Sequence, residues 1–425
     1  MTGTSRRGFL VTAAGAGLAA PAANLAGART ARGTEASSGT HRQAVTLLAA
    51  QPAVSAQLDQ ALTPWLAGLA NRLSVRCNVV CLGDSITEGV HAVGPPFTGF
   101  QNRWLARLAD VLRARFPTQG LTGGGRGFIG AASSGETTFN WPTTIAGSPL
   151  TATTSGPKAK FVQLNAAGQS IAFSLTGDAA DIMWTQASFG GAFSWAVDGG
   201  AATKVSTNGS STVDGKLTRI SLGAAGPHTL LLSWVSGKSN IDGVIEYNGD
   251  AASGIQVHDA AHYGWQTSNW VSALNGGAAA GPAAAIAALG PAAVIISLGS
   301  NDQYAGVPPA TFQARLQTII TSLQARLTSP FPAFVLCLLP ARVGQSGYTY
   351  PWSQYVTAAG NVAAADTSGP GGTSIVSVLD FTAIPTMPPA DSDVYGFWQA
   401  GDLVHPSNRG HEMIADCLAA FLSPS

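Results

Sequence analysis

The sequence predicts a three-layer α/β fold, a parallel sheet with helices on both faces, interrupted by an inserted all-β sandwich domain. Three observations predict it. Apolar runs of strand length alternate with amphipathic helical stretches along most of the chain. Small and polar residues directly follow several of these runs, at the sheet edge where parallel strands place ligands and chemistry. Between about residues 146 and 245 the pattern changes to period-two alternation with frequent turns, typical of a sandwich.

Length and charge limit the function classes. At 425 residues the chain is too long for one ordinary domain. Charged residues make up 10% of it, against about 25% in an average globular protein, and 22 basic residues balance 22 acidic ones. A net charge of zero removes the attraction on which nonspecific nucleic-acid binding depends. We therefore expect no nucleic-acid partner, and the polar, uncharged composition favours neutral partners such as glycans.

The N-terminus has the pattern of a twin-arginine export signal. Arg6 and Arg7 precede an Ala/Gly-rich apolar run that ends near Ala28, with Ala26-Gly27-Ala28 as the cleavage site. The alternative is a membrane anchor, which Pro21 and the glycines disfavour. We expect a signal peptide over residues 1–28, a disordered leader over 29–44, a secreted mature protein, and no membrane span elsewhere.

The first strand carries a candidate nucleophile. An apolar helical stripe over residues 56–73 precedes the run 78–82, which breaks on Gly83-Asp84-Ser85. A second amphipathic helix follows over residues 100–112, so strand, turn and helix form half of a βαβ unit. A hydroxyl at this strand end is a candidate nucleophile, although an ordinary turn is the alternative for an isolated Gly-Asp-Ser.

The inserted sandwich is predicted over residues 146–245, between α/β segments at 45–145 and 246–425. Its alternation places apolar side chains on one face, as in Ile171, Phe173 and Leu175, in Phe193, Trp195 and Val197, and in Leu230, Leu232 and Trp234. Three tryptophans, Trp184, Trp195 and Trp234, are either sugar-stacking platforms or core residues. Their phase with apolar neighbours favours the core.

Strands and helices alternate again after the sandwich. A strand over 255–260 leads into Ala261-His262-Tyr263-Gly264-Trp265, and an Ala/Gly-rich spacer over 276–290 precedes a strand that ends at Gly299-Ser300-Asn301-Asp302. Further elements are a helix over 311–327, a strand over 334–339, a helical segment that begins with the stretch 348–355, and a strand over 375–380. His405 stands directly before a C-terminal helix that Ser407 or Asn408 caps.

Three of these motifs together resemble the GDSL-type serine esterases, also called SGNH hydrolases, which have a flavodoxin-like sheet. Gly83-Asp84-Ser85, Gly299-Ser300-Asn301-Asp302 and Asp402-Leu403-Val404-His405 occur in the order that this family uses, and the resemblance covers about two thirds of the chain. It implies an oxyanion site made by the backbone N–H groups of Ser85 and Gly264 and the Asn301 amide. The context of Gly264 departs from the family pattern, because the usual neighbouring asparagine is missing. Some glycan-active members carry a sandwich inserted in a similar place.

The chemistry explains why these residue types belong together. A serine hydroxyl attacks an ester only when a base removes its proton, and imidazole titrates near neutral pH, so His405 is the candidate base for Ser85. Asp402, three residues before His405, is close enough to orient the second ring nitrogen. Asn301 can donate to an oxyanion without titrating. Asp84 and Asp302 are read as structural, and His262 as a structural or supporting histidine.

No cofactor or metal is expected. The four cysteines are Cys77, Cys81, Cys337 and Cys417, with no Cys-x-x-Cys or His/Cys cluster among them. Cys77 and Cys81 lie four residues apart on a strand, about 13 Å, which is too far for a disulfide. We expect free, buried thiols.

The sequence therefore predicts a secreted serine esterase that hydrolyses short acyl esters, acetyl above all, on a carbohydrate or cell-wall glycan. A lipase or general carboxylesterase is the alternative, and the lack of a long apolar lid counts against a lipase. A glycan-binding protein built on a hydrolase scaffold is the alternative from another class. Acyl transfer to a second sugar would use the same residues. The sequence leaves the oligomeric state open.

Overall fold

The computed structural model describes residues 60–93, 99–118, 123–135, 141–339, 347–383, 396–402 and 404–424. The predicted export signal and leader lie outside these residues. Among the described residues no single helix is long and apolar enough to cross a membrane. The pair Thr267–Gly277 and Pro282–Ala288 passes on length and composition only when both parts are counted across a bend of 74°.

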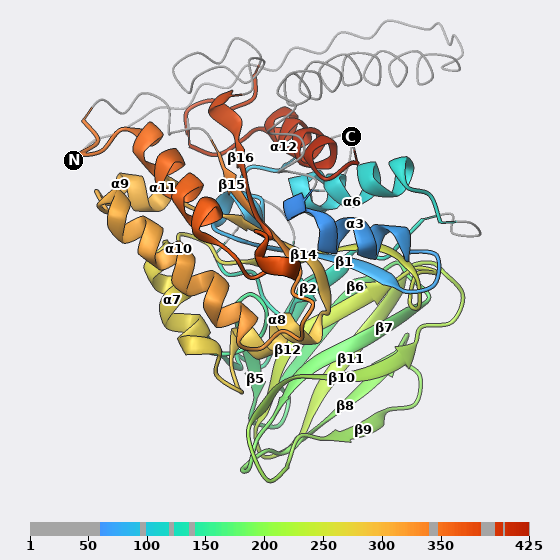
Figure 1. Ribbon diagram of the computed structural model, residues 1–425. Helices are drawn as coiled ribbons and strands as arrows, with labels where there is room; N and C mark the ends of the chain where they lie inside the picture. The colour runs from blue at the N-terminus through green and yellow to red at the C-terminus, as the bar shows by residue number, and fades with distance from the viewer. Residues whose placement is uncertain are drawn as a thin grey trace, which may run out of the picture.

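A five-stranded parallel sheet forms the upper half of the molecule (Figure 1). Its spatial order is β13-β1-β14-β15-β16, and every neighbouring pair is parallel. Of these five strands, β13 comes second in the chain and lies at the edge of the sheet, next to β1, which comes first. This is the doubly wound order of flavodoxin-like folds. The predicted α/β class is confirmed. The strands are β1 (Arg76–Gly83), β13 (Gly254–Ala261), β14 (Pro291–Ser297), β15 (Ala333–Leu338) and β16 (Val376–Asp380).

Helices cover both faces of this sheet because alternate strand residues point to opposite sides. In β1, Val79 and Cys81 belong to the core beneath α3 (Thr63–Ala70), α6 (Trp104–Arg115) and α12 (Asn408–Phe421). Val80 and Leu82 belong to the opposite core, beneath α7 (Thr267–Leu274), α8 (Pro282–Ala288), α10 (Pro309–Gln324) and α11 (Trp352–Ala365). The continuous apolar composition of β1 thus reflects a strand buried on both sides.

Short helices connect these elements at the strand ends. They are α4 (Ser85–Glu88), α5 (Gly99–Asn102), α9 (Ser300–Tyr304), and the 3₁₀ turns η1 (Asn275–Gly277), η2 (Pro370–Gly372) and η3 (Phe381–Ala383). Both α4 and α9 begin directly beyond the carboxyl ends of strands, β1 and β14. This edge of the sheet is therefore where the predicted motifs meet.

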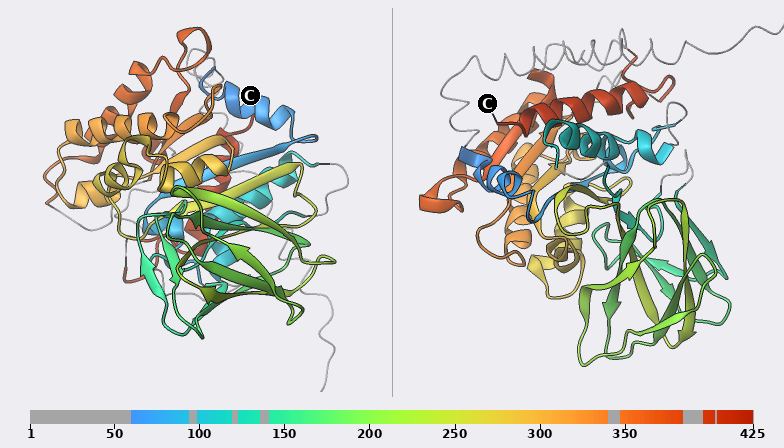
Figure 2. Two further views of the ribbon diagram at one scale, coloured as in Figure 1. Left: turned by 90° about the horizontal axis from the view of Figure 1, so that it is seen from below. Right: turned by 90° about the vertical axis from the view of Figure 1, so that its right-hand side faces the viewer.

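Two antiparallel sheets form the predicted sandwich, which lies below the parallel sheet (Figures 1 and 2). The first has the order β10-β7-β12-β5-β4, with β2 also paired to β12, and the second the order β3-β6-β11-β8-β9. Antiparallel pairing therefore extends from residue 127 to residue 247. The strands are β2 (Gly127–Gly130), β3 (Thr143–Ala146), β4 (Leu150–Ala152), β5 (Phe161–Leu164), β6 (Ser170–Leu175), β7 (Ala179–Gln186), β8 (Ala192–Val197), β9 (Thr203–Ser206), β10 (Val213–Ser221), β11 (His228–Ser236) and β12 (Ser239–Tyr247).

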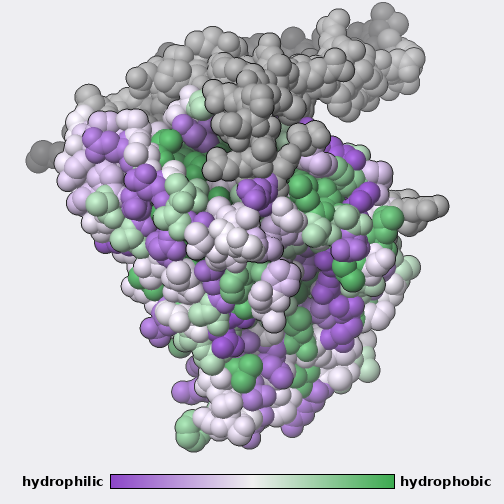
Figure 3. Space-filling model, in the orientation of Figure 1, coloured by the Kyte–Doolittle hydropathy of each residue, from purple (hydrophilic) through white to green (hydrophobic). Residues whose placement is uncertain are grey.

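The central strands of the first sheet, β7 and β12, are buried on both faces. One face packs on the second sheet around a core that includes Phe173, Phe193 and Leu232. The other face adds Met183 and Tyr247 to the core under α7 and α10. The sandwich is thus continuous with the parallel-sheet core rather than attached by a linker. Figure 3 shows hydrophobic side chains scattered among hydrophilic ones over one side of both parts.

Several local predictions can now be compared with the structure. Trp184 is buried in the sandwich core, and Trp195 and Trp234 pack against it, as their phase predicted. All four cysteines are free and buried, also as predicted. The spacer predicted over residues 276–290 instead contains the helix α8. Its sequence explains this, because Pro282 occupies the first turn and the alanines that follow are strong helix formers.

Candidate active site

Ser85 lies at the carboxyl end of the central strand β1, as the first residue of α4. Asp84 caps this helix, with its Oδ1 accepting the Ile86 N–H at 2.9 Å. A Cβ on Gly83 would lie 2.1 Å from Thr87 Oγ1 and 3.0 Å from the Ser297 carbonyl oxygen. Glycine before the aspartate therefore lets the nucleophile turn pack tightly against β14.

The C-terminal motif reaches the same place from the other end of the chain. His405 Nε2 lies 2.9 Å from Ser85 Oγ, and His405 Nδ1 lies 2.6 Å from Asp402 Oδ2. His405 stands just before α12, whose N-cap is Ser407, one of the two predicted caps. The structure thus joins Ser85, His405 and Asp402 directly, although 320 positions separate the serine from the histidine.

The protonation states follow from these contacts. Burial alone raises the pKa of Asp402, but hydrogen bonds and charge interactions with His405 and His91 outweigh it and hold that pKa below its usual range. Asp402 is then a carboxylate, which only accepts hydrogen bonds, so His405 Nδ1 carries a proton. His405 Nε2 of the neutral ring is left to accept the Ser85 hydroxyl proton. This is the arrangement that a general base requires.

A second histidine binds the same carboxylate oxygen, and the sequence reasoning missed it. His91 Nε2 lies 2.6 Å from Asp402 Oδ2, and the rings of His91 and His405 meet edge to face at a centroid separation of 5.7 Å. His91 has a left-handed backbone with φ of 65°. The sequence gives only a weak reason to single out His91: it lies six residues after Ser85, but no recognisable motif surrounds it.

His91, Asp402 and His405 also form a group whose potential metal-ligand atoms all lie within 4.8 Å of one another. Two ring nitrogens of this group donate to Asp402 in the present arrangement. Both would have to lose their protons to bind a cation, so metal binding would compete with the hydrogen bonds of the site.

Asn301 and Gly264 lie beside the nucleophile turn. Asn301 Nδ2 donates to the Trp265 carbonyl oxygen at 3.0 Å and lies 3.4 Å from Asp84 Oδ2. Gly264, exposed and with φ of 72°, directly precedes Trp265. The structure therefore connects Asn301 to Ser85 through Asp84, and to Gly264 through Trp265. Asp302 accepts from the backbone N–H and hydroxyl of Thr267 at the start of α7, a structural contact.

The turn that holds Gly264 is supported from the sandwich. His262 stacks on Trp265 with ring centroids 3.8 Å apart, and its Nδ1 donates to the Lys158 carbonyl oxygen at 2.7 Å. Burial lowers the pKa of His262 to about 4, so the ring is neutral near pH 7. His262 is thus a supporting residue of the turn, within the role that the sequence predicted.

A buried charge cluster lies next to the nucleophile helix. Lys158 Nζ, from the sandwich, lies 2.9 Å from Asp259 Oδ2 and 3.3 Å from Glu88 Oε1. Arg103 Nη1 lies 2.6 Å from the same Asp259 oxygen, and Glu88 also accepts from Ser134. Burial opposes ionisation of Asp259, but the two cations prevail and hold its pKa below the usual range. The cluster ties the sandwich to α4 and β13.

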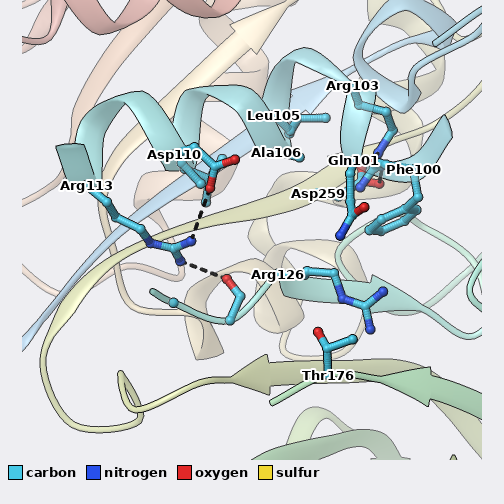
Figure 4. A pocket seen from close by; sticks show the side chains of 14 residues that line it. Phe100, Gln101, Arg103, Leu105, Ala106, Asp110, Arg113, Arg126, Thr176 and Asp259 are labelled. Atoms are coloured by element: carbon cyan, nitrogen blue, oxygen red, sulfur yellow. Dashed lines mark hydrogen bonds and ion pairs between the residues drawn. The ribbon is translucent and has the colours of Figure 1, made fainter. Parts of the chain in front are cut away.

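A pocket lies between α6 and the sandwich and is lined in part by Arg103 and Asp259 of the buried charge cluster (Figure 4). Its volume is about 160 Å³. Each of its arginines has an acidic partner: Arg113 pairs with Asp250, Arg126 with Glu246 and Arg103 with Asp259. Ser85, Asp402 and His405 are not among its lining residues, so this pocket is separate from the catalytic arrangement.

Comparisons with known proteins concern the family and the fold. Residues 237–413 match the model of the GDSL-like lipase/acylhydrolase family. That range includes Gly264, Asn301, Asp402 and His405 but ends short of Ser85 on the N-terminal side. Ser85 nevertheless lies beside these four residues, because β1 lies between β13 and β14 in the sheet. No curated protein gives a significant match.

Among solved structures, one described as a peptidoglycan O-acetylesterase in action superposes with a TM-score of 0.61 at 15% identity, covering 85% of this chain and 94% of that one. At this identity the likeness shows a shared fold. A family two carbohydrate esterase from Clostridium thermocellum in complex with cellohexaose covers 65% of this chain and 97% of its own, at 16% identity and a TM-score of 0.28, too low to add to the argument.

Proposed function

We propose that this chain, an esterase whose residues 237–413 match the model of the GDSL-like lipase/acylhydrolase family, removes short acyl groups, acetyl above all, from a carbohydrate. The observation that carries the catalytic part is the hydrogen-bonded series Ser85, His405, Asp402 at the carboxyl edge of the parallel sheet. An isolated serine hydroxyl is a poor nucleophile, and this series supplies both its base and the group that orients the base.

In the proposed reaction Ser85 Oγ attacks the ester carbonyl carbon while His405 Nε2 takes the hydroxyl proton. The resulting imidazolium is stabilised by the Asp402 carboxylate. When the tetrahedral intermediate collapses, the bond to the sugar oxygen breaks and His405 gives its proton to that oxygen. Water then attacks the acyl-Ser85 ester, again with His405 as base, and releases the carboxylic acid.

The oxyanion of each tetrahedral intermediate is assigned to the backbone N–H groups of Ser85 and Gly264 and to the Asn301 amide. The contact of Asn301 with Asp84 is long, at 3.4 Å, and is the one that can be exchanged for a substrate oxyanion. Catalytic hydrogen bonds are often long before substrate binds. Asn301 therefore donates to the oxyanion without any large movement of α9.

Three features support a carbohydrate as the alcohol component. The chain has few charges and a net charge of zero, which suits a neutral polymer. Its fold is that of a structure described as a peptidoglycan O-acetylesterase. The N-terminal residues 1–28 read as a twin-arginine export signal, so we also propose that the enzyme acts outside the cell, where such polymers occur.

The test compares acetate release from acetylated glycans with hydrolysis of p-nitrophenyl esters of increasing chain length. Ser85→Ala removes the nucleophile, and we expect activity to fall by about 10⁴-fold or more. Ser221→Ala, at an exposed position of β10, is the matched control and keeps wild-type rates. Activity that survives Ser85→Ala contradicts the mechanism. Activity that rises with chain length beyond about eight carbons indicates a lipase instead, and acetyl transfer to an added sugar indicates a transferase.

A further inference from the structure

A groove of about 380 Å³ lies where the sandwich meets α7 and the start of α8. We propose that this α7 groove binds the neutral sugar units of an acylated polysaccharide, beside the unit whose ester is cleaved. The inference deepens the proposed function and rests on it. The groove is lined by Thr153, Thr154, Trp265, Asn269, Ser272, Ala273, Asn275, Ala280 and Gly281.

The lining has the chemistry of a neutral, hydroxyl-rich ligand. All of its side chains are uncharged, and five of them bear a hydroxyl or an amide, which both donate and accept hydrogen bonds. Asn269 Oδ1 already accepts the Gln266 N–H, so its amide nitrogen supplies donors. Ser272 Oγ already donates to the Ser268 carbonyl, so it supplies an acceptor. None of these lining residues has a cationic side chain that could pair with a polyanion.

The indole ring of Trp265 lines one end of the groove, beside the catalytic centre. His262 stacks on Trp265 at 3.8 Å, and Trp270 meets it edge to face at 4.9 Å. The backbone carbonyl of Trp265 accepts the Asn301 amide. A rigid indole offers apolar area at low entropic cost, which suits the face of a sugar ring. The groove therefore begins next to the proposed oxyanion site.

From Trp265 the groove follows α7 away from the catalytic residues. Asn269 lies one turn before Ser272 and Ala273 on this helix, and Asn275 ends it. An eight-residue helix is about 12 Å long, which gives room for more than one sugar unit. The opposite wall, Thr153 and Thr154, comes from the sandwich.

Buried contacts join the start of α8, which also lines the groove, to the sandwich. The Gly281 N–H donates to Asp214 in β10, and Asp214 accepts from Thr185 in β7. Asp214 and Thr185 are both buried, so the base of the groove joins the sandwich to α8 without exposed charge. The sandwich thus acts as one side of the substrate site rather than as a separate binding module.

The test uses two arginine substitutions at exposed helix positions. Ser272→Arg places a bulky charged side chain in the groove, and Thr318→Arg places the same side chain on α10, outside it. For each variant we compare kcat/KM on partially acetylated xylo-oligosaccharides with kcat/KM on p-nitrophenyl acetate. Ser272→Arg is expected to lower kcat/KM on the oligosaccharides about tenfold or more relative to kcat/KM on p-nitrophenyl acetate, through a higher KM for the oligosaccharides. Thr318→Arg is expected to leave this ratio unchanged.

A binding measurement separates this inference from the proposed function. Calorimetric titration of Ser85→Ala enzyme with unacetylated xylo-oligosaccharides and oligogalacturonides should show tighter binding of the neutral series, lost in the Ser85→Ala, Ser272→Arg double variant. If acetylated glycans are cleaved but both arginine variants behave alike, or if the anionic series binds better, the groove assignment is wrong and the proposed function stands. If no Ser85-dependent glycan deacetylation occurs, the proposed function itself fails.

Discussion

The two histidines on Asp402 predict a specific pH dependence. Both His91 and His405 donate to the same oxygen, Oδ2, at 2.6 Å. The His91 hydrogen bond weakens the carboxylate as an acceptor for His405, and a proton on His91 would repel the His405 imidazolium. Both effects favour the neutral form of His405, which is the active base. Replacing His91 should therefore move the acidic limb of the activity profile to higher pH.

The ring separation sets the size of this shift. For two unit charges 5.7 Å apart, Coulomb's law gives about 0.7 kcal/mol in water and about 3 kcal/mol at an effective dielectric constant of about 20. At 1.36 kcal/mol per pH unit, the midpoint of the acidic limb should rise by about 0.5 to 2 units where His91 carries a proton as His405 titrates, and by less where His91 is neutral. The two rings are 13% and 26% exposed, so partial solvent screening favours the lower half of that range.

The assay is kcat/KM for p-nitrophenyl acetate from pH 4 to pH 9, which reports ionisation of the free enzyme. His91→Asn is the variant of choice, because asparagine tolerates the left-handed backbone at this position. His228→Asn is the matched control: His228 also pairs with a carboxylate, that of Asp198, but lies in the sandwich. An acidic limb that stays in place or moves to lower pH in His91→Asn refutes the reasoning.

Three other predictions concern the oxyanion site and the buried charges. Asn301→Ala should lower kcat about 10²- to 10³-fold with little change in KM, measured by steady-state kinetics. Lys158→Met leaves Glu88 and Asp259 buried without their shared cation and should lower the free energy of unfolding by about 3–5 kcal/mol, measured by urea denaturation. Burial raises the pKa of Asp242 well above 3.8, so the folded chain keeps a proton that the unfolded chain releases, and stability falls as the pH rises. Asp242→Asn should therefore be more stable than wild type at pH 7 and similar to it at pH 3.

Much of this fold could be predicted because its signals are local. The apolar run of β1 is explained by burial on both faces, and the turn after it follows from Gly83 and the Asp84 cap. Alternation in β6 and β11 placed Phe173 and Leu232 in the sandwich core, where they are fully buried. Each of these features depends on residues that lie close together in the sequence. This is the range over which sequence patterns carry information.

The features that sequence reasoning missed depend on contacts between distant segments. His91 meets Asp402 across 311 positions, and Lys158 meets Asp259 across 101. Neither pair has a spacing that a local pattern could mark. The helix α8 was missed for another reason: its alanines give no amphipathic period, so only the proline at its start and intrinsic propensity favour a helix.

The position of Lys158 explains why the sandwich and the parallel-sheet part form one catalytic structure. Its ammonium group neutralises Glu88, three residues after Ser85 on the same helix, while its backbone carbonyl holds His262 under Trp265. One residue of the insertion therefore supports the nucleophile helix with its side chain and the proposed oxyanion turn with its main chain. Deleting the insertion would remove the cation that Glu88 and Asp259 share and the acceptor of His262. A hydrolase part freed of its sandwich is accordingly expected to lose both stability and turnover, even though Ser85, Asp402 and His405 all lie outside the sandwich.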